Sequence, residues 1–171
     1  MKKLFYPVLM TACACFLFSG CEENNDPSAI TGKLTSHSDC KIFKSPVFDQ
    51  DTPDTLSCIT FQYDSATNEL NLTHLNAGFN CCPGELSCKV SLKNDTIFVA
   101  EYEEEQTCDC NCLFDLEIEL NGVEPGEYQV TFLEPYAGDQ EPLNFRLHLE
   151  SETEGTCCVI RKEYPWGVTL F

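Results

Sequence analysis

The run "LFDLEIEL", residues 113–120, alternates apolar and charged side chains and constrains the fold more than any other segment. In an extended strand, Phe114, Leu116, Ile118 and Leu120 would share one face, and the acids would point to the other. Similar alternation recurs in "CITFQYD", "ELNLTHL" and "YQVTF", with turn residues such as "SATN" and "KND" between the runs. Period-two alternation predicts half-buried strands, and no stretch shows a sustained helical period.

About eight such runs in a chain of this length predict an all-β protein, a single antiparallel β-sandwich. The segment "NGVEPGEYQV" favours the immunoglobulin- or fibronectin-like kind. Pro125 and Gly126 form a corner, and Tyr128 opens the next strand. This arrangement resembles the strand crossing of those sandwiches, where a tyrosine hydroxyl bonds back to the corner. The β-sandwich domain is expected to span residues 31–171.

The first 21 residues, "MKKLFYPVLMTACACFLFSGC", have the layout of a secretory signal. Lys2 and Lys3 precede an apolar stretch that is short for a membrane-spanning helix, which needs about 20 apolar residues. The ending "LFSGC" resembles the lipobox of bacterial lipoproteins. The resemblance implies a signal peptide over residues 1–20 and lipidation of Cys21 by acyl chains such as palmitate. A plain secreted protein and an uncleaved N-terminal anchor are the alternatives.

Residues 21–30 lack an apolar period and are rich in Asn, Asp, Pro and Ser, as is typical of a flexible tether. The "EENND" after Cys21 resembles the acidic export signal of surface lipoproteins in Bacteroidetes-type bacteria. It implies an exported protein, lipid-anchored to the outer membrane and facing the cell surface, although periplasmic lipoproteins carry such acids too. More than one acyl chain is needed for stable anchoring, so the membrane is the expected partner of Cys21.

The formal net charge is −18, and the predicted signal peptide carries two lysines and no acid. This balance excludes nucleic acid as a natural partner, because phosphate binding needs Lys and Arg. Since the acids are spread along the chain, they are typical of a solvated surface, and capture of cations or of a basic partner is the alternative. An unidentified protein or glycan at the envelope surface is the expected partner.

Cysteine is abundant, with 13 residues in the chain. Cys13 and Cys15 fall in the predicted signal and Cys21 takes the lipid, which leaves ten. An even number in an oxidising compartment predicts five disulfide bonds without a remainder. The "CDCNC" run is expected to pair mainly with "NCCPGELSC", residues 80–88. The ten disulfide candidates are Cys40, Cys58, Cys81, Cys82, Cys88, Cys108, Cys110, Cys112, Cys157 and Cys158.

A metal site is the alternative use of these sulfurs, because thiolates suit Zn²⁺ and Cu(I). The set would be Cys81, Cys82, Cys108, Cys110 and Cys112. Against it, the spacing is C-x-C-x-C, whereas structural zinc sites usually space a pair as C-x₂₋₄-C. A redox centre would need C-x-x-C beside a βαβ pattern, and the sequence has neither. We therefore expect no cofactor.

No nucleophile, zinc-protease, phosphate-loop or dinucleotide motif occurs, so the chain is not expected to be an enzyme. His74 lies in a predicted strand and is interpreted as a hydrogen-bonded structural residue. The acids of "EYEEEQ", residues 101–106, offer the carboxylate pair of a glycan-acting enzyme as the least favoured alternative.

Two further binding sites are weaker candidates. Asp49, Asp51 and Asp54 resemble the start of a calcium loop, but the loop's glycine and its terminal glutamate are missing. Trp166 with Tyr164 near the C-terminus offers a stacking platform for a sugar or peptide ligand, or closes one end of the core.

The segment from "NAGFNCCPG" through "CDCNCLFDLEIELNGVEPGEYQV", residues 76 to about 130, resembles a group of uncharacterised exported lipoproteins of gut Bacteroidetes. The cysteine arrangement is the specific part of this likeness. It implies a small β-rich surface or periplasmic domain, and it supplies no activity or functional residue.

Overall fold

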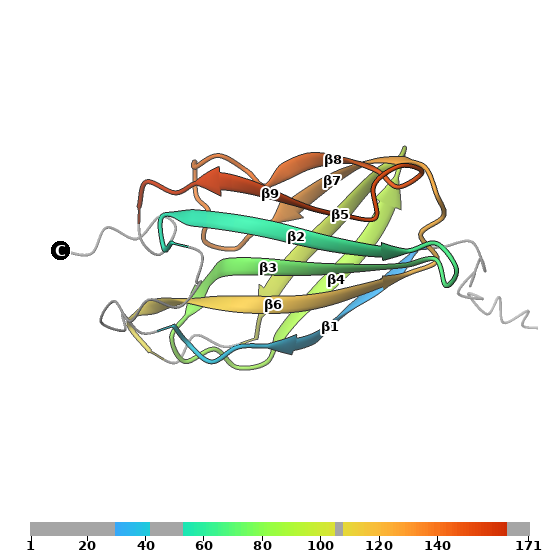
Figure 1. Cartoon of the computed structure of the whole chain (residues 1–171). Coiled ribbons are helices and arrows are strands. Elements are labelled where there is room, and N and C mark those ends of the chain that lie inside the picture. The colour runs from blue at the N-terminus through green and yellow to red at the C-terminus, as the bar shows by residue number, and fades with distance from the viewer. Residues whose placement is uncertain (1–29, 42–52, 105–107, 164–171) are drawn as a thin grey trace, which may run out of the picture.

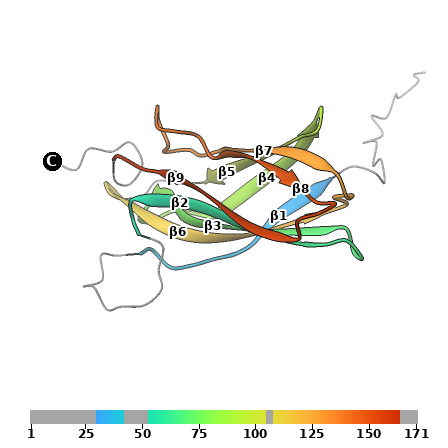
Figure 2. The same ribbon diagram turned by 45° about the horizontal axis from the view of Figure 1, so that its top comes forward.

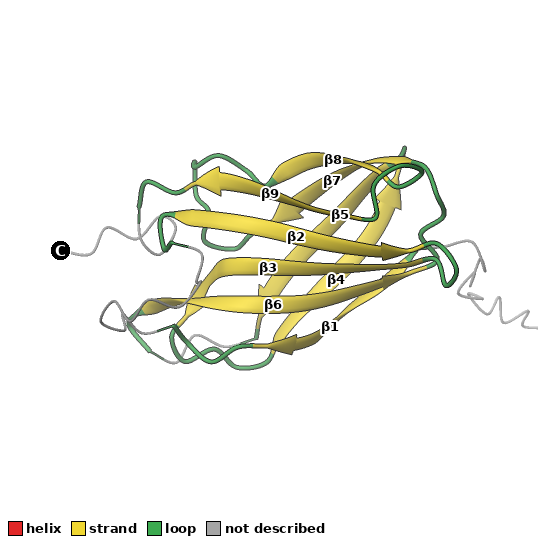
Figure 3. Ribbon diagram, in the orientation of Figure 1, coloured by secondary structure: helices red, strands yellow, loops and turns green. Residues whose placement is uncertain are grey.

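The computed structural model describes residues 30–41, 53–104 and 108–163, and every regular element in these ranges is a β-strand (Figure 1, Figure 3). Within these ranges no helix has the length and apolar character needed to cross a bilayer. The strands are β1 (Thr31–His37), β2 (Leu56–Asp64), β3 (Glu69–Asn80), β4 (Leu86–Lys93), β5 (Thr96–Glu103), β6 (Asn111–Asn121), β7 (Glu127–Leu133), β8 (Asn144–His148) and β9 (Glu154–Ile160).

The strands form two sheets that pack face to face, and Figure 2 shows them as separate layers. One sheet has five strands in the order β1-β6-β3-β2-β9, and the other has four in the order β4-β5-β7-β8. In Figure 1, β2, β3 and β6 cross in front of β4 and β5. The predicted all-β sandwich is therefore confirmed.

One pair of strands departs from the antiparallel prediction, because β5 and β7 run parallel. The chain leaves β5, crosses to the other sheet as β6, and returns as β7. Two successive reversals of direction bring β7 back parallel to β5. All the other pairs of neighbouring strands are antiparallel.

The alternation in the sequence produces the core. Leu116, Ile118 and Leu120 of β6 are buried between the sheets, while Glu117 between them is exposed. Both predicted hairpins form: β2 pairs with β3, and β4 pairs with β5. The second turn uses positive φ at Asn94 and Asp95, the backbone that tight two-residue hairpin loops require.

The corner before β7 also forms as predicted. The Tyr128 hydroxyl donates a hydrogen bond to the Glu124 carbonyl oxygen at 3.0 Å. This bond spans Pro125 and Gly126 and fixes the angle at which the chain enters the four-stranded sheet. The immunoglobulin- or fibronectin-like type remains a prediction, since the corner is one local feature of such folds.

Several candidate residues lie outside the described ranges: Cys21, Asp49, Asp51, Tyr164 and Trp166. Of the proposed calcium ligands, the described one is Asp54, which is exposed in the turn before β2.

Candidate functional site

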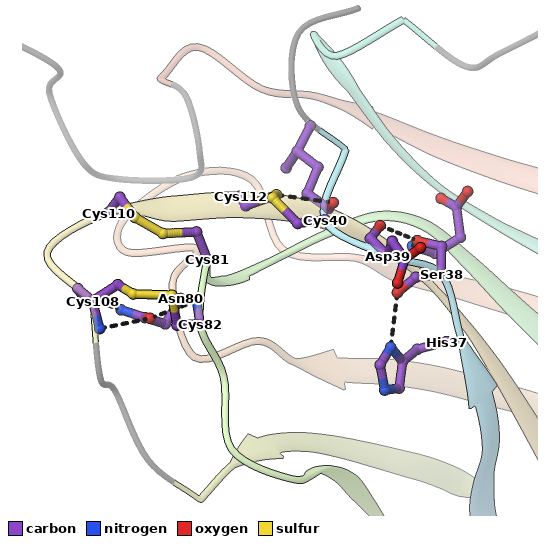
Figure 4. Close-up of a disulfide and its surroundings, with 12 residues drawn as sticks. His37, Ser38, Asp39, Cys40, Asn80, Cys81, Cys82, Cys108, Cys110 and Cys112 are labelled. Carbon is purple, nitrogen blue, oxygen red and sulfur yellow. Dashed lines mark hydrogen bonds between the residues drawn. A yellow bond between two sulfur atoms is a disulfide. The ribbon is translucent and has the colours of Figure 1, made fainter.

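Three disulfide bonds gather at one end of the sandwich, where β3 ends and β6 begins (Figure 4). Cys81 and Cys82, just after β3, bond to Cys110 and Cys108. The Cα atoms of the two pairs are 5.6 and 5.5 Å apart, inside the usual range for a disulfide. The two bridges therefore lie side by side and tie the end of β3 to the approach to β6.

Asn80, buried at the end of β3, organises the chain around these bridges. Its Oδ1 accepts a hydrogen bond from the Cys82 amide at 2.9 Å and a longer one from the Cys108 amide at 3.4 Å. Its Nδ2 donates to the Cys108 carbonyl oxygen at 2.6 Å. One side chain thus holds both bridged segments, and its buried polar atoms are satisfied by backbone groups.

The predicted pairing of "CDCNC" with "NCCPGELSC" is confirmed for Cys108 and Cys110 and is wrong for Cys112. Strand β6 begins at Asn111, so Cys112 is a strand residue while the other two precede the strand. Cys112 bonds instead to Cys40, which follows β1, the neighbour of β6 in the sheet. Cys108, Cys110 and Cys112 would point to one face of the sheet only if all three lay inside the strand.

The fourth bridge joins Cys58 of β2 to Cys158 of β9, which lie directly opposite each other. The prediction of five bridges is wrong, because Cys88 and Cys157 are free. Cys88 lies on β4, at one edge of the four-stranded sheet, beside β1. Cys157 lies on β9, at the edge of the other sheet that is farthest from β1. These positions are at opposite sides of the sandwich, beyond the reach of a disulfide.

Four disulfides in a domain of this size indicate an exported or extracellular protein, since such bonds persist in oxidising compartments.

The same sulfurs contain the best metal-ligating geometry in the described residues. The Sγ atoms of Cys81, Cys82 and Cys108 lie within 4.8 Å of one another. Of the five predicted ligands, Cys110 belongs to the same pair of bridges, whereas Cys112 is bonded to Cys40.

A second polar assembly lies inside the sandwich, between the sheets. His74 of β3 is fully buried, and its Nε2 lies 2.8 Å from the Ser57 Oγ of β2. Its Nδ1 lies 2.7 Å from Glu101 Oε1 on β5, in the opposite sheet. The interpretation of His74 as a hydrogen-bonded strand residue therefore agrees with its position.

Arg161 and Glu134 complete this buried network. The Arg161 guanidinium contacts both oxygens of Glu134, at 2.7 and 2.6 Å, and lies 3.3 Å from Ser57 Oγ. Both side chains are almost fully buried. The network therefore places two acidic side chains, Glu101 and Glu134, against two basic ones, His74 and Arg161, and such pairing is how buried ionisable groups are tolerated.

The pKa values of the central pair reflect this environment. Burial alone would lower the pKa of His74, but the carboxylates of Glu101 and Glu134 raise it overall above the ordinary 6.5. Burial raises the pKa of Glu101, and His74 and Arg161 offset this only partly. The folded pair therefore retains its proton to a higher pH than the same groups in the unfolded chain.

Ser57, His74 and Glu101 have the contact distances of a hydrolytic triad. Ser57 and His74 are 0% exposed, however, so no substrate can reach the hydroxyl in this conformation. In this conformation the arrangement joins the two sheets and does not present the Ser57 hydroxyl to solvent. Sequence reasoning missed it because its members come from five separate segments, each without a recognisable motif.

Within the acid run of residues 101–106, Glu101 and Glu103 do not form the solvated carboxylate pair that a glycan-acting enzyme would need. Glu101 points into the core toward His74. Glu103 accepts hydrogen bonds from the Tyr136 hydroxyl and from the Asn80 amide. These contacts give Glu101 and Glu103 structural partners at the end of β5.

The outer faces of the two sheets differ in charge. The face of the five-stranded sheet, called here the acidic face, has a polar groove of about 620 Å³ lined by side chains that include Thr60, Gln62 and Asn71. Among the strand residues of this sheet, Lys33 is the one lysine, and there is no arginine. The outward acids of its strands are Asp64, Glu69, Asp115, Glu117, Glu119 and Glu154.

The outer face of the four-stranded sheet is called here the basic face. Its strands direct Lys89, Lys93 and Arg146 outward against a single outward acid, Glu127.

Comparison with known proteins adds no assignment for either face: no family model, curated protein or solved structure matches the chain at a significant level.

Proposed function

We propose that this chain is a lipid-anchored, disulfide-cross-linked domain at the outer membrane, with a binding or structural role there. The observation that carries the proposal is the set of four disulfides in a sandwich whose first strand begins ten residues after a lipobox-like cysteine. Disulfides require an oxidising compartment, and a lipidated Cys21 would hold the domain at the membrane through a short tether.

Metabolic labelling tests the anchor. Cells expressing the full chain with a clickable palmitate analogue are fractionated, and Cys21→Ser is compared with Cys15→Ser, a matched change inside the predicted signal peptide. Wild type and Cys15→Ser should carry label and partition into detergent. Cys21→Ser should lose both properties. Label retained in Cys21→Ser would contradict lipidation of Cys21 and, with it, the proposed attachment of the domain to the outer membrane.

The sulfur geometry favours one second candidate function, a thiolate metal site. If a dithiol reductant opened both adjacent bridges, Cys81, Cys82, Cys108 and Cys110 would offer four thiolates, three of whose sulfur atoms lie within 4.8 Å of one another. Four converging thiolates suit Zn²⁺ or Cu(I).

Metal titration separates the two functions. The reduced full chain is titrated with Zn²⁺ and competed with a chromogenic chelator, and Cys82→Ser is compared with Cys58→Ser. Tight stoichiometric binding lost only in Cys82→Ser would establish the metal site. Equally weak Zn²⁺ binding by wild type and both variants would contradict the metal site and favour the first proposal, a disulfide-cross-linked domain with a binding or structural role.

A further inference from the structure

The basic face has an arrangement that the overall charge does not predict. In a chain of net charge −18, three of its ten Lys and Arg residues lie on one outer face, where Glu127 is the one outward acid in the strands. Glu127 Oε1 lies 3.4 Å from His148 Nδ1, and Asp95, in the turn between β4 and β5, lines the same small pocket as Glu127 and Arg146. The net surface is therefore acidic, but this face attracts anions locally.

Strand pairing fixes how these cations are placed. Lys89, Ala100 and Leu133 form one row across β4, β5 and β7. Two rows away, Lys93 and Arg146 lie at the opposite ends of a row that crosses all four strands. Four residues along a strand separate Lys89 from Lys93, about 13 Å. A single small anion cannot touch two of these cations, whereas a polymer with repeated anionic groups can.

The surface between the cations is apolar and hydroxylated. Tyr102 is 45% exposed and Leu133 is 52% exposed, both next to Ala100 on this face. Lys89 Nζ lies 5.6 Å from the centre of the Tyr102 ring, so the cation and the ring form one unit. Phe98, Ser91 and Thr131 form the row between the two rows of cations.

From this combination we infer that the basic face binds a linear acidic polysaccharide. Carboxylates on successive sugars would meet Lys89, Lys93 and Arg146, and the apolar face of a sugar ring would pack on Tyr102. The remaining surface is acidic and repels a broad anionic partner. A narrow chain lying along this face stays more than a Debye length, about 8 Å, from the acidic face behind the core.

The inference rests on the proposed binding role at the cell envelope and names its ligand class. Single-stranded nucleic acid also carries one negative charge per unit, but it is usually held in a positively charged groove that follows its backbone, and this face offers three separate cations on the outside of a sheet. An acidic peptide would use the cations but not the exposed ring. The test therefore includes both of these polyanions as competitors.

Affinity electrophoresis tests the inference with the full chain in a mild detergent. Gels contain polygalacturonate or neutral dextran, and salt is varied. The pair Lys89→Gln with Arg146→Gln is compared with Lys33→Gln with Lys162→Gln, which changes net charge equally but away from this face. The first double variant should bind polygalacturonate about tenfold more weakly than wild type, as expected for two lost exposed ion pairs. The control double should bind as wild type does.

A second variant tests the ring independently of charge: Tyr102→Ala should weaken binding, and Tyr102→Phe should retain it. Equal losses in both double variants, or no retardation of wild type at low salt, would overturn the inference. Equal or tighter binding to poly-glutamate, single-stranded DNA or anionic lipid vesicles would overturn the polysaccharide assignment. These measurements use purified protein, so their outcome does not depend on whether Cys21 carries a lipid. A negative result here would contradict the polysaccharide ligand, whereas a negative labelling result would contradict the lipid anchor.

Discussion

His74 Nδ1 lies 2.7 Å from Glu101 Oε1, and this contact connects the two sheets through the core of the sandwich. Both side chains are shielded from water, so neither can replace its partner with a hydrogen bond to solvent. A buried pair of this kind contributes little net stability compared with apolar packing, but breaking it leaves an uncompensated buried group. Its main physical effects are a fixed relation between the sheets and a dependence of stability on pH.

The first prediction concerns that pH dependence. A histidine whose pKa rises on folding stabilises the fold fully below its unfolded value of 6.5, and this contribution is lost as the pH rises through the folded value. The raised pKa of Glu101 acts in the same direction, because the folded state again binds the proton more tightly. The free energy of unfolding should therefore fall as the pH rises above 6.5, the ordinary pKa of His74.

Urea unfolding of wild type and Glu101→Gln, with disulfides intact, measures this effect. The variant should lose roughly 3–5 kcal/mol at mildly acidic pH and show a flatter pH profile, because the carboxylate that raises the pKa of His74 is gone. His148→Gln is the control, since His148 is 43% exposed and lies at the surface. A wild-type stability that is flat or rises across this range would contradict the prediction.

The second prediction concerns Ser57. Its hydroxyl is 0% exposed and contacts both His74 and Arg161, so a fluorophosphonate probe should not label the native protein. Ser57→Ala should instead destabilise the fold by about 1–3 kcal/mol, because buried polar groups lose a partner. Ser91→Ala, an exposed serine on β4, should leave stability unchanged. Labelling of wild type that disappears in Ser57→Ala would show that the triad-like geometry is accessible and reactive.

The third prediction concerns the thiols. Alkylation of the unfolded, unreduced protein should label Cys88 and Cys157 among the ten domain cysteines, and reduction should expose all ten. In the native protein Cys88 should react slowly near neutral pH, because burial, with a further contribution from Glu101, raises its pKa to about 11. Burial raises the pKa of Cys157 as well. Absence of free thiol in the unfolded protein would show a fifth bond, between copies of the chain.

Much of the fold could be predicted from local pattern, because a strand with one buried face leaves a period of two in its own residues. The runs that became β2, β3 and β6 were predictable for this reason. Strand β1 was not, since it is an edge strand whose one large apolar residue is Leu34. The parallel pairing of β5 with β7 depends on how the chain crosses between sheets, which no local pattern records.

In the candidate sites, too, the local features could be predicted from the sequence, whereas the features set by strand placement could not. The two segments that contain Cys82 and Cys108 could be matched because each is a short cysteine-rich turn, whereas the residue-to-residue pairing within them could not. The bond from Cys40 to Cys112 spans 72 residues and depends on the placement of β1 beside β6. The partners of His74 are set entirely by sheet packing, so the buried network required the structure.

The fourth prediction concerns a close approach between β9 and β2. Gly155 lies opposite Phe61, and a Cβ added to it would be 2.5 Å from Phe61 Cε1 and 2.9 Å from Cζ. Gly155→Ala should therefore destabilise the fold by about 1–3 kcal/mol through overpacking. Phe61→Leu in the same chain should recover part of that loss, because the smaller side chain leaves room for the new methyl group. Gly126→Ala is the matched control, since its added Cβ would meet Tyr128 at an ordinary 3.7 Å. Urea unfolding of the two single variants and the double variant measures the coupling, and strictly additive losses would show that β9 moves away from Phe61 freely.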